Sequence, residues 1–335
     1  MNTYQWIRSL LAQEKRVAIP IMTHPGIELI GRRVADAVTD GEIHFRAIEA
    51  LARRFPMAAS TTIMDLTVEA EAFGAALHLE ADDIPSIAGR LVTDYAGVRE
   101  LPLPTLDAKR IPQYLKADEL AARHLDVPVF AGCIGPFSLA GRLYGMTEIM
   151  MSIYIEPETV MLLLEKCTEF LLQYCHAIRQ TGVAGILMAE PAAGLLSNDD
   201  CRAFSSVYVR RIVEAVQDES FTVVLHNCGN TGHCTQAMLA TGAGGYHFGN
   251  RADMVELLRM CPADVPVMGN VDPVAVLKLA APEQVYAETC SLLERTSDFP
   301  NFILSTGCDV SPHTPMENIE AFYRALRQYN ERFSS

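Results

Sequence analysis

The chain has 335 residues and a formal net charge of −14, because 27 Lys and Arg residues stand against 41 Asp and Glu residues. Half of the residues are hydrophobic and 20% are charged, a balance that fills an ordinary core and excludes wholesale disorder. The acidic excess argues against a general grip on nucleic acid or on an anionic membrane surface. We therefore expect a small molecule or another protein as the partner.

Short apolar runs, each ending in a polar or small residue, alternate with longer helical patterns. The expected strands are Val17–Met22, Met57–Met64, Val127–Ile134, Ala184–Ala189, Phe221–Leu225, Gly244–Phe248, Val265–Met268 and Phe302–Ser305. The expected helices include Glu42–Arg54, Pro157–Gln180, Asp199–Gln217, Asp253–Arg259, Pro282–Leu293 and Glu317–Arg327. Eight alternations suit a single (β/α)8 TIM barrel over residues 1–335 better than two open sheets.

The stretch from Phe73 to Leu125 holds more residues than one strand–helix unit needs. We interpret it, at about 73–125, as an insertion over the barrel mouth. The alternative fold is a doubly wound α/β sheet, but no expected strand is followed by the GxGxxG turn typical of that class.

The nine cysteines are odd in number, irregularly spaced and absent from the first third of the chain, which does not suit a disulfide framework. The first twenty residues lack a cationic start followed by an apolar run, and charges interrupt every stretch long enough to span a bilayer. We expect a reduced, cytoplasmic protein whose cysteines fill the core or bind metal.

In a barrel, chemistry takes place where the strands end at the C-terminal face. The residues at those ends are His24, Asp65, Gly135, Glu190, His226 with Cys228, His247, Asn270 with Asp272, and Cys308. Most of these side chains can act chemically, whereas purely structural loops favour Ser, Gly, Pro and Asn.

His226 and Cys228 give the sharpest local signal, because residues i and i+2 of an extended segment point the same way and can face one ion. The His-x-Cys spacing alone is weak evidence for a metal site, since random placement of the His and Cys residues would produce about 0.25 such pairs in a chain of this composition. The alternative is a buried cysteine beside a hydrogen-bonded histidine. Cys308 follows Gly307 at the end of the last expected strand and can complete a His-Cys-Cys set around one Zn²⁺.

Three protein ligands leave one tetrahedral position open, which is typical of catalytic zinc. Two thiolates and a neutral imidazole cancel the charge of the ion. A substrate thiol in the open position can therefore lose its proton and remain nucleophilic. The pattern predicts alkyl transfer to sulfur.

Four segments resemble the uroporphyrinogen decarboxylase superfamily, and within it the cobalamin-dependent methyltransferase branch that includes methylcobamide:coenzyme M methyltransferases. They are Asp65–Gly74, Gly135–Phe137, His226–Asn230 and Gly307–Asp309 running into Pro312–Pro315, and Gly269–Pro273 is similar to the seventh-strand loop of the family. The resemblance implies a (β/α)8 barrel with zinc on His226, Cys228 and Cys308. It also implies a methylated corrinoid (cobalamin) on a separate carrier protein, with a zinc-bound thiol such as coenzyme M attacking the methyl group.

The sequence departs from a true decarboxylase of this superfamily, which holds the porphyrinogen carboxylates with two N-terminal arginines in an RQAGRY-type motif. The matching region here reads THPGIELIGR, from Thr23 to Arg32. This departure argues against porphyrinogen decarboxylation, which we keep as an alternative function. A corrinoid-dependent demethylase, which moves methyl from an ether, amine or halide to cobalt, is another, and a non-catalytic corrinoid-binding or zinc-storage barrel is a third.

Asp65 and Glu190 are the predicted catalytic carboxylates. Asp65 could orient the nucleophile or approach the corrinoid, with an N-cap as the structural alternative. Glu190 ends an apolar strand, where a carboxylate is costly unless it is paired or bound to metal, so we expect either a fourth zinc ligand or a salt bridge. Glu69 and Glu71 are expected as charges on a helix face, with Glu71 the better site candidate.

His247, Asn270 and Asp272 are predicted to contact the cofactor or the substrate at the mouth. A hydrogen-bonded core histidine is the alternative for His247 and also for His24, and a turn that starts a helix is the alternative for Asp272. Cys234 is a potential decoy ligand. The sequence leaves open whether the barrel forms a homodimer.

Overall fold

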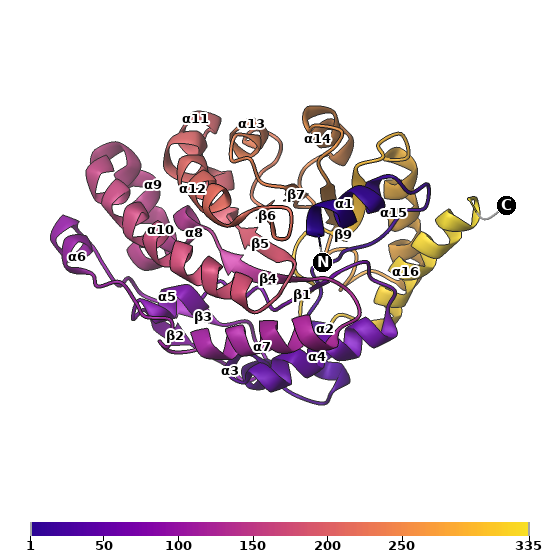
Figure 1. Cartoon of the computed structure of the whole chain (residues 1–335), viewed down its shortest axis with the longest axis horizontal. Helices are drawn as coiled ribbons and strands as arrows, with labels where there is room; N and C mark the ends of the chain where they lie inside the picture. Colours follow the sequence, from indigo (N-terminus) through magenta and orange to yellow (C-terminus); the bar gives the residue numbers. More distant parts are fainter. Residues whose placement is uncertain (1, 334–335) are drawn as a thin grey trace.

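The computed structural model describes residues 2–333 and contains a parallel sheet that curls into a barrel with helices around it (Figure 1). The sheet order is β1-β4-β5-β6-β7-β8-β9. The strands are β1 Ser60–Thr61, β4 Val129–Ile134, β5 Gly185–Ala189, β6 Thr222–Asn227, β7 Gly245–Phe248, β8 Val267–Val271 and β9 Phe302–Thr306. The expected TIM-barrel fold is confirmed.

The eighth position of the ring is filled by residues 17–19, which form a single bridge, Ala18 to Leu304, and no full strand. The Ile19 amide donates to the Leu304 carbonyl at 2.9 Å, and the Leu304 amide donates to the Val17 carbonyl at 3.1 Å. On the other side the Ala58 amide donates to the Ala18 carbonyl at 2.9 Å. The expected strand Val17–Met22 is cut short because Pro20 has no N–H to donate.

The second expected strand, Met57–Met64, is reduced to Ser60–Thr61 because side chains take over its later hydrogen bonds. The Ile63 amide donates to His44 Nε2 at 2.8 Å, and the Gly132 amide of β4 donates to Thr62 Oγ1 at 3.0 Å. The other six strands lie within three residues of their expected bounds, the largest difference being the end of β8 at Val271 and not Met268.

The strands read as continuous apolar runs because both of their faces are buried. One face fills the barrel interior with side chains from five strands, from the start of the chain and from the residues on either side of β1: Ile19, Ile21, Ala59, Met64, Phe130, Leu187, Ala189, Val224, Met268 and Ile303. The other face packs under the surrounding helices in a larger cluster.

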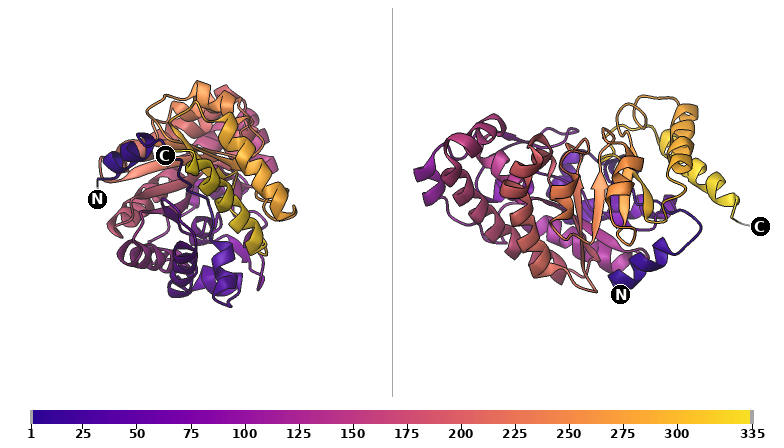
Figure 2. Two further views of the ribbon diagram at one scale, coloured as in Figure 1. Left: turned by 90° about the vertical axis from the view of Figure 1, so that its right-hand side faces the viewer. Right: turned by 90° about the horizontal axis from the view of Figure 1, so that it is seen from above.

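Figure 2 shows the helices arranged around the sheet. The longer ones are α4 Gly41–Arg54, α7 Ile111–His124, α10 Pro157–Gln180, α12 Val207–Val216, α15 Pro282–Arg295 and α16 Met316–Glu331. The shorter ones are α1 Thr3–Leu11, α2 His24–Leu29, α3 Val34–Thr39, α5 Val68–Ala72, α11 Asn198–Cys201, α13 Thr235–Leu239 and α14 Met254–Met260. The expected helix Asp199–Gln217 is divided into α11 and α12 by a π-helical turn, Arg202–Ser206.

The stretch 73–125 contains a hairpin of β2 Ala76–His78 and β3 Ser86–Ala88, then α6 Tyr95–Glu100 and α7. Helix α7 packs on α4 and so belongs to the helical layer of the barrel. Helix α6, together with α8 Pro136–Tyr144 and α9 Met146–Ile155, packs against α10 on the left of Figure 1. No helix within residues 2–333 combines the length and the apolar character needed to cross a membrane.

Helix α2, which follows the first barrel segment, rests directly on α4. Gly26 permits this approach, because a Cβ at that position would lie 2.1 Å from the Ala47 backbone oxygen. We expect Gly26→Ala to lower the free energy of unfolding by about 1–3 kcal/mol through overpacking, measured by urea denaturation. Gly97→Ala in α6 is the control: its nearest atom would be 3.5 Å away, so this change should be neutral or raise stability by about 0.5–1 kcal/mol. Equal effects of the two substitutions would contradict the packing argument.

Candidate functional site

The structure brings His226, Cys228 and Cys308 together at the C-terminal ends of β6 and β9. Their ligand atoms all lie within 4.8 Å of one another, and Cys308 Sγ is 3.6 Å from His226 Nε2. His226 is buried and the two thiols are partly exposed. Among the residues from 2 to 333, no other His, Cys, Asp and Glu side chains form such a donor group.

The turn that carries Cys228 is fixed by the preceding asparagine. Asn227 Oδ1 accepts hydrogen bonds from the amides of Gly229 and Asn230, both at 3.0 Å. Gly249 allows the loop after β7 to pass behind the cysteine, because a Cβ there would lie 2.7 Å from Cys228 Cα. The HNCGN sequence therefore folds into a turn that presents Cys228 beside His226.

The two thiols interact electrostatically. A hydrogen bond from Cys308 lowers the pKa of Cys228, although burial acts in the opposite direction. The same bond, and then burial, raise the pKa of Cys308 well above its ordinary value. The first thiolate of the pair therefore forms on Cys228, with the remaining proton on Cys308.

His247 lies behind His226 and is 1% exposed. Its Nδ1 is 2.8 Å from His226 Nδ1, and its Nε2 is 2.8 Å from Ser305 Oγ. Ser305 uses its only hydroxyl proton on the Ile19 carbonyl at 2.7 Å, so it must accept from His247 Nε2–H. His247 Nδ1 then accepts from His226 Nδ1–H, which leaves the lone pair of His226 on Nε2, toward Cys308.

Both ring nitrogens of His247 are therefore engaged by protein groups, and neither is left for a corrinoid or a substrate. Burial and the neighbouring His226 hold the pKa of His247 well below its usual range, so the ring is neutral, as the hydrogen-bond chain requires. The sequence predicts His247 at the mouth of the barrel, whereas in the structure it lies behind His226.

Helix α2 holds the loop that carries Cys308. His24 Nδ1 is 3.1 Å from a carboxylate oxygen of Asp309, and His313 Nδ1 is 3.1 Å from Glu28. His24 and Glu28 are four residues apart and so share one face of the helix. Burial alone would lower the pKa of His24, but the Asp309 carboxylate outweighs it and the pKa lies above its usual value. His24 thus stabilises the Cys308 loop through the adjacent residue.

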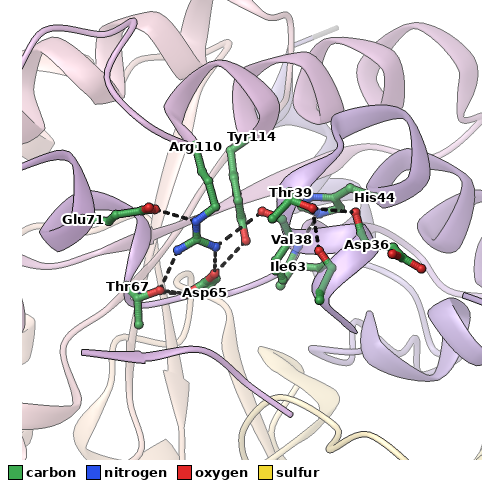
Figure 3. A network of polar contacts seen from close by, with 11 residues as sticks. Asp36, Val38, Thr39, His44, Ile63, Asp65, Thr67, Glu71, Arg110 and Tyr114 are labelled. Carbon is green, nitrogen blue, oxygen red and sulfur yellow. Dashed lines mark hydrogen bonds and ion pairs between the residues drawn. The ribbon is translucent and has the colours of Figure 1, made fainter. Parts of the chain in front are cut away.

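Asp65 is the centre of a buried ion-pair network (Figure 3). Its Oδ2 accepts from Arg110 Nη1 at 2.5 Å and from the Tyr114 hydroxyl at 2.9 Å, and its Oδ1 accepts from the amide and hydroxyl of Thr67. Arg110 Nε also contacts Glu71 at 2.6 Å. With four donors on its two oxygens, Asp65 is held rigidly, and its carboxylate organises this side of the mouth.

Glu190 follows β5 and is 1% exposed. Its oxygens accept from the Phe137 amide at 2.7 Å, the Ser138 amide at 2.9 Å and the Ser138 hydroxyl at 2.7 Å. It therefore caps the N-terminus of α8, where negative charge is favourable, and lies outside the donor group of His226. Burial raises the pKa of Glu190 to about 7. The close approach of Glu190 also explains why residue 135 is a glycine, since a Cβ at that position would lie 2.2 Å from Glu190 Cγ.

Asn270 and Asp272, predicted as binding residues, fix loops on the β8 side of the mouth. Asn270 Nδ2 donates to the carbonyls of Gly249 and Ala252 at 2.9 and 2.8 Å. Asp272 Oδ1 accepts from the amides of Val274 and Ala275, which is the turn that its position before Pro273 suggested. Both line a cavity of about 360 Å³ together with residues of α15.

Glu69 is the residue that the sequence analysis missed. The expectation of a helix-face charge is wrong, because Glu69 is 1% exposed. Its Oε1 accepts from the Ile134 amide at 3.0 Å, while Oε2 is buried without a hydrogen-bond partner in the described range. The five-residue helix α5 offers too short a periodicity to reveal its buried face.

The uroporphyrinogen decarboxylase (URO-D) family model matches residues 16–329, so the chain belongs to that family. The methylcobamide:CoM methyltransferase MtbA of Methanosarcina mazei is 29% identical over 272 residues, 79% of this chain and 78% of that protein. The uroporphyrinogen decarboxylase of Serratia proteamaculans is 26% identical over 293 residues, 84% and 81% of the two chains. A solved methyltransferase structure from Methanosarcina mazei, 22% identical, covers 98% of this chain and 99% of its own, with a TM-score of 0.87. The family resemblance expected from the sequence is confirmed.

Glu69 makes the stability depend on pH. Burial raises its pKa from 4.5 to about 7. The folded protein thus binds this proton more tightly than the unfolded chain, and the stability that it contributes is complete below pH 4.5 and lost as the pH rises through about 7. Glu69→Gln removes this titration. We expect wild type to lose about 1–3 kcal/mol relative to the variant between about pH 5 and 8.

The measurement is urea unfolding of both proteins at the two pH values. Other buried carboxyls, such as Glu190, titrate in both proteins, so the difference between them isolates Glu69. Glu214→Gln, at an exposed position of α12, is the matched control and should leave the pH dependence unchanged. A constant difference between wild type and Glu69→Gln across the pH range would refute the assignment.

Proposed function

We propose that the protein is a zinc-dependent methyltransferase that exchanges a methyl group between a corrinoid on a separate carrier protein and a small thiol such as coenzyme M. The observation that carries the proposal is the His226, Cys228 and Cys308 donor group at the C-terminal rim of the barrel. The names of the MtbA relatives agree with it, because they specify a methylcobamide and a thiol.

The donors present fit zinc. One imidazole and two thiols form a soft, borderline set that zinc prefers. Tetrahedral zinc with ordinary bond lengths places a sulfur and a nitrogen ligand about 3.6 Å apart, and Cys308 Sγ and His226 Nε2 are 3.6 Å apart. Bound by these residues, zinc would lower the pKa of a substrate thiol and leave it nucleophilic.

In the proposed transfer, the thiol sulfur forms a bond to the methyl carbon as the cobalt–carbon bond breaks. The bonding electron pair stays on cobalt, and the thiol proton passes to solvent. The residues of this chain position the reactants: His247 keeps the lone pair of His226 on Nε2, and the contacts of α2 hold the Cys308 loop in place. The reverse direction, demethylation onto cobalt, uses the same groups.

Decarboxylation is the second candidate, because decarboxylases of the same family are 25–26% identical to this chain. The residues of α2, which follow the first barrel segment, favour methyl transfer over decarboxylation. Helix α2 turns His24 and Glu28 toward the loop after Cys308, and neither is a permanent cation that could hold a polycarboxylate.

The main test is Cys308→Ala. We expect the purified variant to lose its zinc and its rate of methyl transfer from methylcobalamin to a thiol to fall by at least about 100-fold, because a two-ligand site binds zinc weakly. Zinc is measured by elemental analysis and transfer by the change in corrinoid absorbance. Cys234→Ala is the control, since Cys234 donates to the Leu196 carbonyl and lies outside the donor group. A zinc-free wild type, together with an active Cys308→Ala variant, would disprove the proposal.

A second test concerns His247. His247→Phe keeps the ring volume but removes the acceptor for His226 Nδ1–H, so we expect zinc to bind about 10–100-fold more weakly. Affinity is measured by competition with a chromophoric chelator. His44→Phe is the matched control: it is a buried histidine too, but it accepts from the Ile63 amide. Equal zinc affinities of the His247 and His44 variants would show that His247 does not support the metal ligand.

A further inference from the structure

The loop after β7 is in close contact with the backbone of both cysteine loops of the donor group. A Cβ at Gly249 would lie 2.7 Å from Cys228 Cα and 2.8 Å from its carbonyl oxygen. A Cβ at Gly307, the residue before Cys308, would lie 2.6 Å from the amide nitrogen of Asn250 and 3.1 Å from its Cα. Residues 249–250, which we call the spacer, therefore touch one cysteine ligand directly and the loop of the other ligand through its preceding residue.

These contacts join backbone to backbone, so no side-chain rotation can relieve them, and a close-packed interior transmits such a displacement. Gly307 is also fixed from the other side, because its amide donates to the Val271 carbonyl of β8 at 2.7 Å. The loop that carries Cys308 is thus held between β8 and the spacer. The separation of Cys308 from Cys228 follows from where the spacer lies.

Two side chains at the end of β8 hold the spacer, one for each of its residues. Asn270 Nδ2 donates to the Gly249 carbonyl at 2.9 Å, and Asp272 Oδ2 accepts from Asn250 Nδ2 at 2.5 Å. The other oxygen of Asp272 accepts from two backbone amides of the turn that follows, at 2.8 and 2.7 Å. This carboxylate is therefore fixed in orientation, and it fixes the side chain of Asn250 in turn.

We propose that the spacer sets the separation of Cys228 and Cys308 that a metal ion requires. Asp272, together with Asn270, is the positioning residue that holds the spacer. The inference rests on the proposed function for the identity of the metal as zinc. Tetrahedral zinc needs its ligand atoms at fixed distances, and groups outside the ligand set that orient the ligands typically change metal affinity 10- to 100-fold.

The first experiment overpacks the spacer with Gly249→Ala. The added methyl group pushes against Cys228, so we expect the Kd for zinc, measured by competition with a chromophoric chelator, to rise about 10- to 100-fold. Gly185→Ala is the matched control, because a Cβ there would lie 2.1 Å from the Thr222 backbone oxygen at the start of β5, away from the donor group. This variant should lose stability in urea and keep the wild-type Kd for zinc.

The second experiment alters the clamp without adding volume. Asn250→Asp places two carboxylates against each other, so we expect the Kd for zinc to rise about 10-fold. Adding Asp272→Asn to that variant exchanges the donor and the acceptor, keeps the net charge of wild type and restores one hydrogen bond between the two positions. The double variant should return to within about threefold of the wild-type Kd. The absorption of bound Co²⁺, which depends on the thiolate geometry, gives a readout independent of turnover.

Equal zinc affinities of Gly249→Ala and Gly185→Ala, or a double variant no better than Asn250→Asp, would overturn the inference. The proposed function can fail separately: zinc bound with the expected differences among the variants, but without methyl transfer to any thiol, would refute methyl transfer and leave the spacer in place. A wild type that binds neither zinc nor Co²⁺ would overturn both.

Discussion

The site depends on the closure of the parallel sheet between β9 and the short segment at residues 17–19. The same segment that completes the ring also ends the hydrogen-bond chain to the donor group: the Ile19 carbonyl accepts from Ser305, Ser305 accepts from His247, and His247 accepts from His226. The Val310 amide donates to the Ile21 carbonyl at 2.9 Å, which fastens the loop after Cys308 to the residues that follow this segment. Barrel closure and the geometry of the donor group are therefore one constraint, although His226 and Cys308 are 82 residues apart in sequence.

The mouth is chemically divided by this arrangement. The β6 and β9 side presents soft donors, held by neutral hydrogen bonds from behind. The β1 side presents charges: Asp65 and Glu71 around Arg110. In a partly buried site, charged groups are costly unless they are paired with each other or with a ligand. The charges on the β1 side meet this condition by pairing with one another.

The sequence predicts the strands well and their chemistry only in part. Strand positions follow from apolar runs, and the exceptions have local causes, such as Pro20 and the His44 side chain that replaces a strand partner at Ile63. The donor group could be proposed because His226, Cys228 and Cys308 end strands that a barrel brings to one rim. The burial of Glu69 and the position of His247 could not be predicted, because each depends on which long-range partners a side chain meets, and no short-range periodicity encodes that.

The family contains both methyltransferases and decarboxylases, so the barrel alone does not select the reaction. In this chain the first segment and α2 both contact the loop after Cys308. Here α2 carries His24 and Glu28 on the face that meets the loop after Cys308, and its close packing on α4 through Gly26 fixes that face. His24 and Glu28 each pair with a residue of the loop after Cys308, so this face of the helix supports that loop. Because both side chains are engaged by the loop that follows Cys308, this face of α2 is committed to holding that loop.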